Sequence, residues 1–257
     1  MLFDTHVHLN SRMYKKDLRE VIERALAAGV TRMAVVGFDA PSNVHAIKLA
    51  EQYEFIYAVV GIHPSDARSA TENSWTVLRE QLKHPKVVAL GECGFDYYHD
   101  TSFNDIQRVV FKKQLEIARE LDMPIVVHMR DSVNDTYEML RDAGQGLSGV
   151  LHCYSGDVHM MHKFLDLGFY IGLDGPVTFK NAHGVHEVAK AVPIERLVIE
   201  TDAPYLTPAP YRGKRNEPAY VSYVARAIAE LRGMTYEEVC RITTKNALTM
   251  YNIKGVF

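Results

Sequence analysis

The sequence predicts an α/β fold in which eight parallel strands alternate with helices and close into a (β/α)8 barrel. The chain has 257 residues, close to the roughly 250 residues typical of this fold. Short apolar runs recur at intervals of roughly 30 residues, and each is followed by a segment whose apolar residues have helical spacing. The runs are nearly continuous rather than alternating, as expected where both faces of a parallel sheet are buried.

The expected strands follow from these runs in chain order. The first is 3–10, which carries the alternating stretch FDTHVHLN. The others are 32–37 (RMAVVG), 55–62 (FIYAVVGI), 87–92 (VVALGE), 124–128 (PIVVH), 149–152 (GVLH), 169–173 (FYIGL) and 197–200 (LVIE).

The expected helices occupy the segments between and after the strands. In the first, Leu18, Val21, Ile22 and Ala25 recur at helical spacing, and Gly29 ends the pattern. The last helix begins with a capping box formed by Thr235 and Glu238. The full set is 15–28, 41–53, 73–83, 103–121, 132–143, 158–167, 182–191, 218–232 and 235–251.

Domain organisation and composition narrow the class of protein. Because the sequence contains no linker, it predicts one TIM-barrel domain over 1–257. The Pro-rich segment 204–218 is expected to be a long loop of this domain. A doubly wound open sheet is the alternative fold. A net charge of −3 excludes a generally basic, nucleic-acid-coating protein but not an enzyme with a local basic patch. Three widely spaced cysteines without a CxxC pair indicate neither a disulfide framework nor a thiolate zinc site.

The chain begins without a signal-peptide pattern, and no apolar run is long enough to span a bilayer. We therefore expect a reduced, cytoplasmic protein without membrane association. Its oligomeric state stays open, a monomer included.

Residues that bind metals occur at the ends of several expected strands. His6 and His8 lie on one face of the first strand, and histidine is the commonest metal ligand. Later strands end in His63, Glu92, His128, His152 and Asp202. Because the carboxyl ends of barrel strands share one rim, where enzymes of this fold keep their active sites, these side chains should meet. Each alone could be an ordinary hydrogen-bonded residue, but their equivalent positions favour a metal site.

The expected ligands are four imidazoles and two carboxylates: His6, His8, Glu92, His128, His152 and Asp202. Without a thiolate, this set suits Zn²⁺, Mn²⁺, Co²⁺ or Mg²⁺. One catalytic ion needs fewer ligands, so we expect two divalent ions about 3.5–4 Å apart. Glu92 lies between the two histidine groups around the barrel and is expected to bridge the ions.

A second set of residues is expected to contact substrate. Arg130 follows His128 by two positions, and Arg212, Lys214 and Arg215 lie in the loop after the eighth strand. Loops after strands seven and eight often bind phosphate in this fold; a solvated turn is the alternative for this charged run. Glu200 is expected to hydrogen-bond a ligand rather than to bind metal.

Seven motifs follow one another along the chain: FDTHVHL (3–9), GIHP (61–64), GECGFDY (91–97), VHMRD (127–131), LHCYSG (151–156), ETDAPY (200–205) and RNEP (215–218). Together they resemble the TatD family of metal-dependent hydrolases, the TatD-like deoxyribonucleases, from Leu2 to the C-terminal helix. The resemblance implies a TIM-barrel metallohydrolase with nuclease activity. It places the ligand roles on the same six residues. Some members lack the first histidine pair, which this chain keeps, and relatives with a carbamylated lysine bridge would need lysine in place of Glu92.

From the residues and the resemblance we expect a divalent-metal phosphodiesterase, a 3′→5′ exonuclease on single-stranded DNA or RNA. Asp202 and Glu92 are the expected catalytic residues, with Asp202 taking the proton of the attacking water. The expected substrate contacts are His63, Arg130, Tyr154, Arg212, Lys214 and Arg215. The alternatives are an amidohydrolase or a D-aminoacyl-tRNA deacylase that uses the same two-metal site, and a barrel whose metals serve binding with little turnover.

Overall fold

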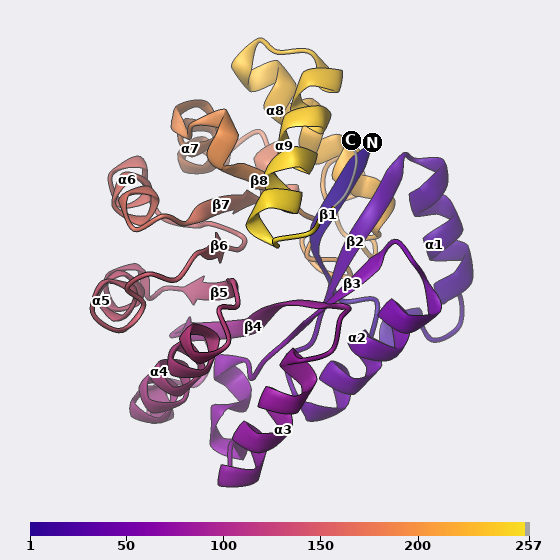
Figure 1. Ribbon diagram of the computed structural model, residues 1–257. Coiled ribbons are helices and arrows are strands. Elements are labelled where there is room, and N and C mark those ends of the chain that lie inside the picture. Colours follow the sequence, from indigo (N-terminus) through magenta and orange to yellow (C-terminus); the bar gives the residue numbers. More distant parts are fainter. Residues whose placement is uncertain (255–257) are drawn as a thin grey trace.

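The computed structural model describes residues 1–254 and confirms the (β/α)8, or TIM, barrel (Figure 1). Its eight strands are parallel, and neighbours in the sheet are neighbours in the sequence. The strands are β1 Leu2–Val7, β2 Val30–Val36, β3 Ile56–Val60, β4 Val87–Asp96, β5 Ile125–Arg130, β6 Gly149–Leu151, β7 Tyr170–Leu173 and β8 Leu197–Ile199.

Helices surround the strands, and their bounds lie within three residues of those expected from the sequence. They are α1 Leu18–Ala27, α2 Ala40–Gln52, α3 Glu72–Leu82, α4 Asn104–Glu120, α5 Val133–Ala143, α6 Val158–Asp166, α7 His183–Ala191, α8 Val221–Arg232 and α9 Tyr236–Met250. The capping box of α9 is confirmed, since Glu238 N–H donates to Thr235 Oγ1 and Thr235 N–H to Glu238 Oε2. Several short 3-10 helices, among them η2 Pro64–Ser69, occupy expected loops, and η6 Pro218–Tyr220 takes the place of the first turn of the helix expected over 218–232.

The barrel closes between its first strand and the segment after its last. Val7 and Ala203 form a parallel bridge. Asp202 N–H donates to the carbonyl oxygen of His6 at 2.9 Å, and His8 N–H donates to that of Ala203 at 2.8 Å. These bonds replace a full β1–β8 ladder and bring Asp202 beside His6 and His8.

The interior of the barrel is a valine-rich core that α9 covers at one end. Side chains from alternate strand positions form this core, among them Phe3, Val36, Val59, Val126, Val150 and Val198. Leu248 and Met250 of α9, together with Tyr251 directly after it, pack onto these side chains. Tyr251 Oη donates to the carbonyl oxygen of Thr5 at 2.8 Å. With the amino-terminal end covered, the opposite end of the strands is free to carry the polar residues.

Strand β4 is longer than expected, because it continues past Glu92 to Asp96 and pairs with β5 as far as Arg130. Glycine makes this close pairing possible. Gly94 has φ +143°, and a Cβ there would collide with the carbonyl oxygen of His128. Glu92 therefore lies within a strand, between its neighbours β3 and β5, rather than at a strand end.

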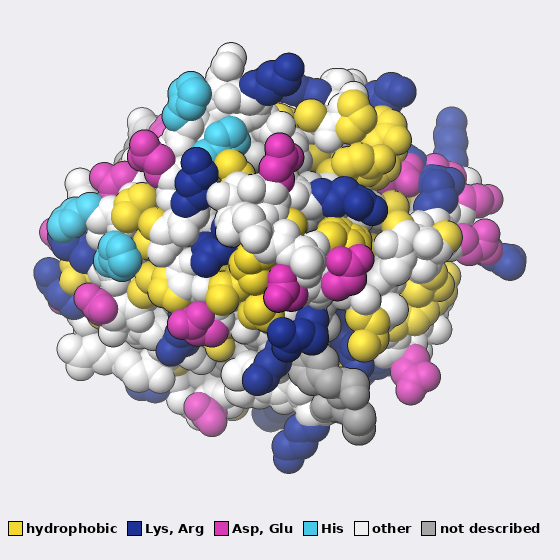
Figure 2. Space-filling model, turned by 90° about the horizontal axis from the view of Figure 1, so that it is seen from above, with side chains coloured by type: hydrophobic (Ala, Val, Ile, Leu, Met, Phe, Trp, Pro, Cys, Tyr) yellow, Lys and Arg dark blue, Asp and Glu magenta, His cyan; other side chains and the backbone are white. Residues whose placement is uncertain are grey.

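Within residues 1–254, no helix is long and apolar enough to cross a membrane. The face seen in Figure 2 carries basic, acidic and apolar side chains side by side, so no single sign of charge covers it. Electrostatic recognition on this side must therefore be local.

Candidate metal centre

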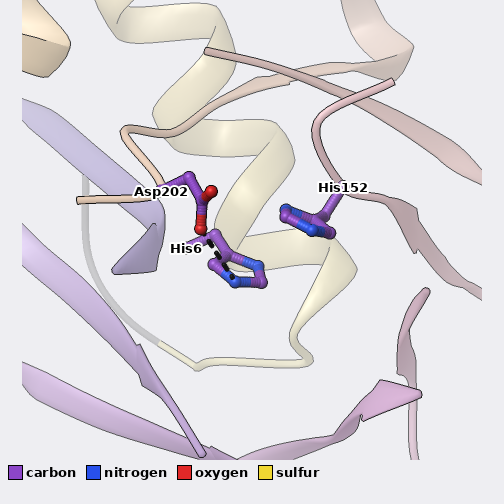
Figure 3. Close-up of side chains that lie close together, drawn as sticks. All are labelled: His6, His152 and Asp202. Carbon is purple, nitrogen blue, oxygen red and sulfur yellow. Dashed lines mark ion pairs between the residues drawn. The ribbon is translucent and has the colours of Figure 1, made fainter. Parts of the chain in front are cut away.

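Asp202 meets His6 of β1 and His8, which directly follows β1, where the barrel closes. Its Oδ1 lies 3.3 Å from His8 Nε2 and 3.7 Å from His6 Nε2. His152 approaches from β6, and its ring stacks on that of His6 with centroids 3.9 Å apart (Figure 3). The ligand atoms of His6, His152 and Asp202 lie within 4.8 Å of one another.

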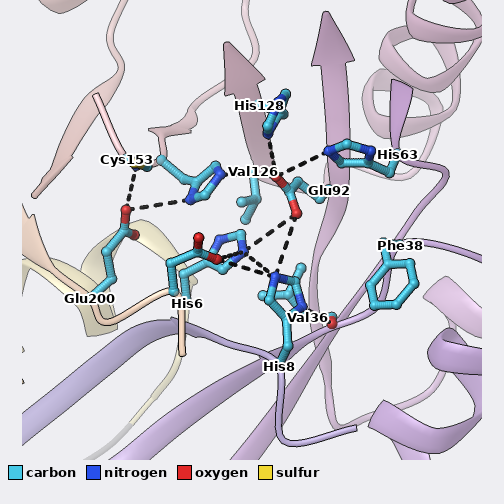
Figure 4. A network of polar contacts seen from close by, with 12 residues as sticks. His6, His8, Val36, Phe38, His63, Glu92, Val126, His128, Cys153 and Glu200 are labelled. Atoms are coloured by element: carbon cyan, nitrogen blue, oxygen red, sulfur yellow. Dashed lines mark hydrogen bonds and ion pairs between the residues drawn. The ribbon is translucent and has the colours of Figure 1, made fainter. Parts of the chain in front are cut away.

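Glu92 stands at the centre of the remaining imidazoles, with a side chain that is 5% exposed. One of its oxygens, Oε2, lies 3.5 Å from His6 Nε2 and 3.8 Å from His8 Nε2. The other, Oε1, lies 2.6 Å from His128 Nδ1 and 2.9 Å from His152 Nε2. The carboxylate thus faces two histidine groups through different oxygens (Figure 4).

His63 joins this cluster, although the sequence suggested a substrate contact for it. Its Nε2 lies 3.7 Å from Glu92 Oε1, and its ring is edge-on to that of His128 at 4.4 Å. The ligand atoms of His63, Glu92 and His128 also lie within 4.8 Å of one another. The signal was present in the sequence, since His63 follows β3 as the other candidates follow theirs.

The residues present fit divalent metal ions. Nε2 of His6 and Nε2 of His8 are only 3.3 Å apart. The buried Nδ1 atoms of His6 and His152 have no hydrogen-bond partner; Glu200 Oε1 lies 3.5 Å from His152 Nδ1 without hydrogen-bond geometry. Crowded nitrogen atoms around buried carboxylates form a donor set that suits borderline or hard cations.

Electrostatics at the cluster favours the same conclusion. Burial would raise the pKa of Glu92, but His152, His63 and His128 hold it well below its usual value. Burial and the neighbouring His128 lower the pKa of His63 to about 3. Although burial opposes a charge on His152, Glu92 and Glu200 raise the pKa of that imidazole well above its usual value. The carboxylates therefore attract positive charge, which bound cations would supply.

The cluster opens into a cavity of about 400 Å³ at the carboxyl end of the strands. Its lining includes five residues besides the candidate ligands already described: Asp96, His99, Arg130, Tyr205 and Leu206. The cavity is therefore polar at its base, where the imidazoles and carboxylates converge, and has cationic and aromatic side chains among the others.

Comparison with known proteins now identifies the family. The sequence model described as TatD related DNase matches residues 3–252. The chain belongs to the TatD family. It is 49% identical over 254 residues to the uncharacterized metal-dependent hydrolase YabD of Bacillus subtilis, covering 98% of this chain and 100% of that one. It is 36% identical over 259 residues to the 3′-5′ ssDNA/RNA exonuclease TatD of Salmonella typhimurium, covering 98% and 99%.

Solved structures agree with this assignment. The crystal structure of YJJV, a TatD homolog from Escherichia coli K12, superposes with a TM-score of 0.92 at 29% identity, covering 98% of each chain. The chain is therefore a TatD-family metal-dependent hydrolase with the expected barrel.

Two buried acids of this TatD-family chain hydrogen-bond to segments next to the candidate ligands. Glu200 accepts a hydrogen bond from Cys153 N–H at 2.5 Å and one from Thr5 Oγ1 at 3.3 Å, next to His152. Asp4 accepts from Thr201 N–H at 2.9 Å and from Thr201 Oγ1 at 2.6 Å. Glu200 is thus bonded to the backbone after His152 rather than to the imidazole that the sequence led us to expect, and Asp4 fixes the backbone that carries Asp202.

Asp96 is a member of the site that sequence reasoning missed. Its Oδ2 lies 3.2 Å from His128 Nε2, and its Oδ1 accepts from the N–H groups of Tyr98 and His99. Asp96 follows Glu92 by four positions in one strand, so the longer β4 places both carboxylates on one face. Recognising that extension in the GECGFDY motif would have revealed it.

Two expected substrate contacts have different surroundings in this TatD-family chain. Arg130 is exposed and lines the cavity, with its guanidinium carbon 4.2 Å from the centre of the Tyr98 ring. Tyr154 is 3% exposed, and its Oη donates to the carbonyl oxygen of Asp157 at 2.9 Å. Tyr154 is therefore buried against the protein and is not among the residues that line the cavity.

The three loop cations also differ from one another, and none is among the residues that line the cavity. Arg212 and Lys214 are exposed. Arg215 instead donates to both carboxylate oxygens of Asp17 and to the carbonyl oxygen of Met13, and it lies 3.3 Å from Glu217. This guanidinium fastens the loop after β8 to the segment before α1.

Arg215→Ala should lower the free energy of unfolding by about 1–2 kcal/mol, because a two-point ion pair of partly buried groups is removed. Urea denaturation measures this effect. Arg212→Ala is the matched control and should change stability by less than about 0.5 kcal/mol, because the side chain is exposed. Equal effects of the two substitutions would contradict the fastening role of Arg215.

Proposed function

We propose that this chain is a two-metal phosphodiesterase that removes nucleotides from the 3′ end of single-stranded DNA or RNA. The observation that carries the proposal is the arrangement around Glu92, whose two oxygens face different histidine groups 2.6–3.8 Å away. Paired metal sites sharing a carboxylate suit in-line displacement at phosphorus. The Salmonella relative, named a 3′-5′ ssDNA/RNA exonuclease, supports the choice of nucleic acid and of direction.

The proposed ligands are His6, His8, Glu92, His128, His152 and Asp202, and His63 is near enough to join them. When bound there, two divalent cations would lower the pKa of water and neutralise charge on the phosphoryl oxygens. Glu92 would bridge the two positions through its separate oxygens.

The chain's own groups supply the rest of the chemistry. Asp202, whose Oδ1 faces His8, is placed to hold the proton removed from the attacking water. The water oxygen forms a bond to phosphorus as the bond to the 3′ oxygen of the preceding nucleotide breaks, and that oxygen takes up a proton. Arg130, exposed at the cavity, would hold a phosphate oxygen of the strand.

The test is digestion of a 5′-labelled single-stranded oligonucleotide with Mg²⁺ or Mn²⁺ present. A 3′-5′ exonuclease shortens the labelled strand one nucleotide at a time, whereas digestion from the 5′ end releases the label at once. Ester, amide and D-aminoacyl-tRNA substrates are assayed in parallel. Turnover of an amide or aminoacyl substrate with no shortening of any oligonucleotide would contradict the proposal and favour the amidohydrolase or deacylase alternative.

Within this proposal Arg212 and Lys214 bind substrate phosphates. Replacing both with alanine should flatten the salt dependence of oligonucleotide binding by about 0.7 in log–log slope for each phosphate that is no longer neutralised. Fluorescence anisotropy over a series of salt concentrations measures the slope. Lys112→Ala, an exposed lysine on α4, should leave it unchanged. An unaltered slope in the double variant would make this loop a solvated turn.

A further inference from the structure

Two tyrosine side chains near the cavity are exposed to solvent. Tyr98 is 60% exposed and Tyr205 is 54% exposed. Every other Phe, Tyr or Trp of residues 1–254 is buried or only partly exposed. An aromatic ring presents a large apolar face, and its exposure at a cavity is typical of a binding surface.

The two rings belong to opposite sides of the barrel. Tyr98 follows β4 and Tyr205 follows β8, and these strands are four positions apart in the ring of eight. Tyr205 lines the cavity, and its ring centre is 6.2 Å from that of His8. The guanidinium carbon of Arg130 lies 4.2 Å from the centre of the Tyr98 ring, and Arg130 lines the cavity.

Both tyrosines have firmly held backbones. Tyr205 N–H donates to the carbonyl oxygen of Asp202 at 2.9 Å, and its own carbonyl oxygen accepts from the side-chain amide of Asn216 at 2.6 Å. Tyr98 N–H donates to Asp96 Oδ1 at 3.0 Å. Asp202 and Asp96 are members of the candidate site, so the backbone of each tyrosine is anchored to that site. A held backbone reduces the conformational entropy that is lost when a flat ligand binds to the ring.

We propose that Tyr205 and the Tyr98–Arg130 pair are two stacking platforms that hold unpaired nucleobases on either side of the metal cluster. The inference rests on the proposed nuclease function and specifies its substrate as a strand whose terminal bases are unstacked. Aromatic rings bind any base through its π-face, so the platforms would bind strands of any base sequence. In a duplex the base faces are covered by neighbouring pairs, which explains why a single strand would be selected.

The test compares kcat and KM on two oligonucleotides of equal length: an ordinary single strand, and one whose last two residues at the 3′ end are abasic. On the ordinary strand, Tyr205→Ala and Tyr98→Ala should each raise KM roughly tenfold, the effect of removing one stacked base, and should change kcat less. On the abasic strand, each alanine variant and the wild type should have similar KM values, because the wild type has no base to stack. Tyr205→Phe and Tyr98→Phe, which keep the rings, should restore a low KM on the ordinary strand.

An exposed apolar residue away from the cavity provides the control for the tyrosine variants. Val109→Ala removes a side chain that is 68% exposed on α4, away from the cavity, and should leave KM unchanged. Metal content and thermal midpoint are measured for each variant to confirm folding. If the wild type shortens no oligonucleotide, the nuclease function fails and the platforms fail with it. If it shortens the ordinary strand while both alanine variants keep KM within about twofold of the wild type, the platforms alone are overturned.

Discussion

Glu92→Ala should lower bound divalent metal from about two ions per chain towards one and should reduce turnover by more than about 100-fold. The substitution removes an anionic oxygen from each of the two histidine groups at once. Two cations would then repel each other with less negative charge between them, so the weaker position should empty. Elemental analysis gives the stoichiometry, and steady-state kinetics gives the turnover.

The matched control for this substitution is Glu187→Ala, which removes an exposed carboxylate from α7. It should alter neither metal content nor turnover. The thermal midpoint of Glu92→Ala should change less than its activity, because Glu92 is not part of the apolar core. A Glu92→Ala protein that keeps two ions, or that turns over at nearly the wild-type rate, would show that Glu92 is no bridge.

Removal of metal should abolish activity, and Mn²⁺, Co²⁺ or Mg²⁺ should restore it. The candidate ligands are imidazoles and carboxylates without a thiolate, and such sites exchange divalent ions. The measurement is turnover after dialysis against a chelator and again after titration with each ion. Elemental analysis verifies that the ions have left and returned.

Circular dichroism of the metal-free protein is the control for this experiment. It should retain the helical signal, because apolar packing around the strands holds the barrel. Full turnover by a protein that elemental analysis shows to be free of metal would refute the metal-dependent mechanism.

Most of the barrel could be predicted from the sequence, because buried parallel strands are apolar on both faces. The main error in the strands concerned β4, which the apolar run VVALGE predicted only as far as Glu92. Beyond that point the strand contains glycine and aspartate, which are unfavourable in strands. The absence of a Cβ at Gly94 permits the close pairing with His128, and strand propensity alone does not predict such a tertiary contact.

The site was predictable as far as strand ends determine it. The structure brings together the six residues that the sequence placed at strand ends, although Glu92 lies within β4, and His63 lies among them by the same rule. The fate of individual cations was not predictable. Arg130 and Arg215 have the same charge and both follow a strand end in sequence, yet one lines the cavity and the other binds Asp17. Which carboxylate a long side chain reaches depends on distant segments that only the fold brings together.

The closing bonds between His6, His8 and the segment 202–203 join two parts of the candidate site that are made at different times during synthesis. These partners are 195 and 196 residues apart in a chain of 257 residues, and pairing over such a separation is slow because a long loop must close first. During synthesis, the emerging chain carries its first histidine pair long before the aspartate that completes their cluster. A chain that is partly made or partly folded therefore has His6 and His8 without Asp202, so the proposed ligand set is assembled only when the segment after β8 meets β1.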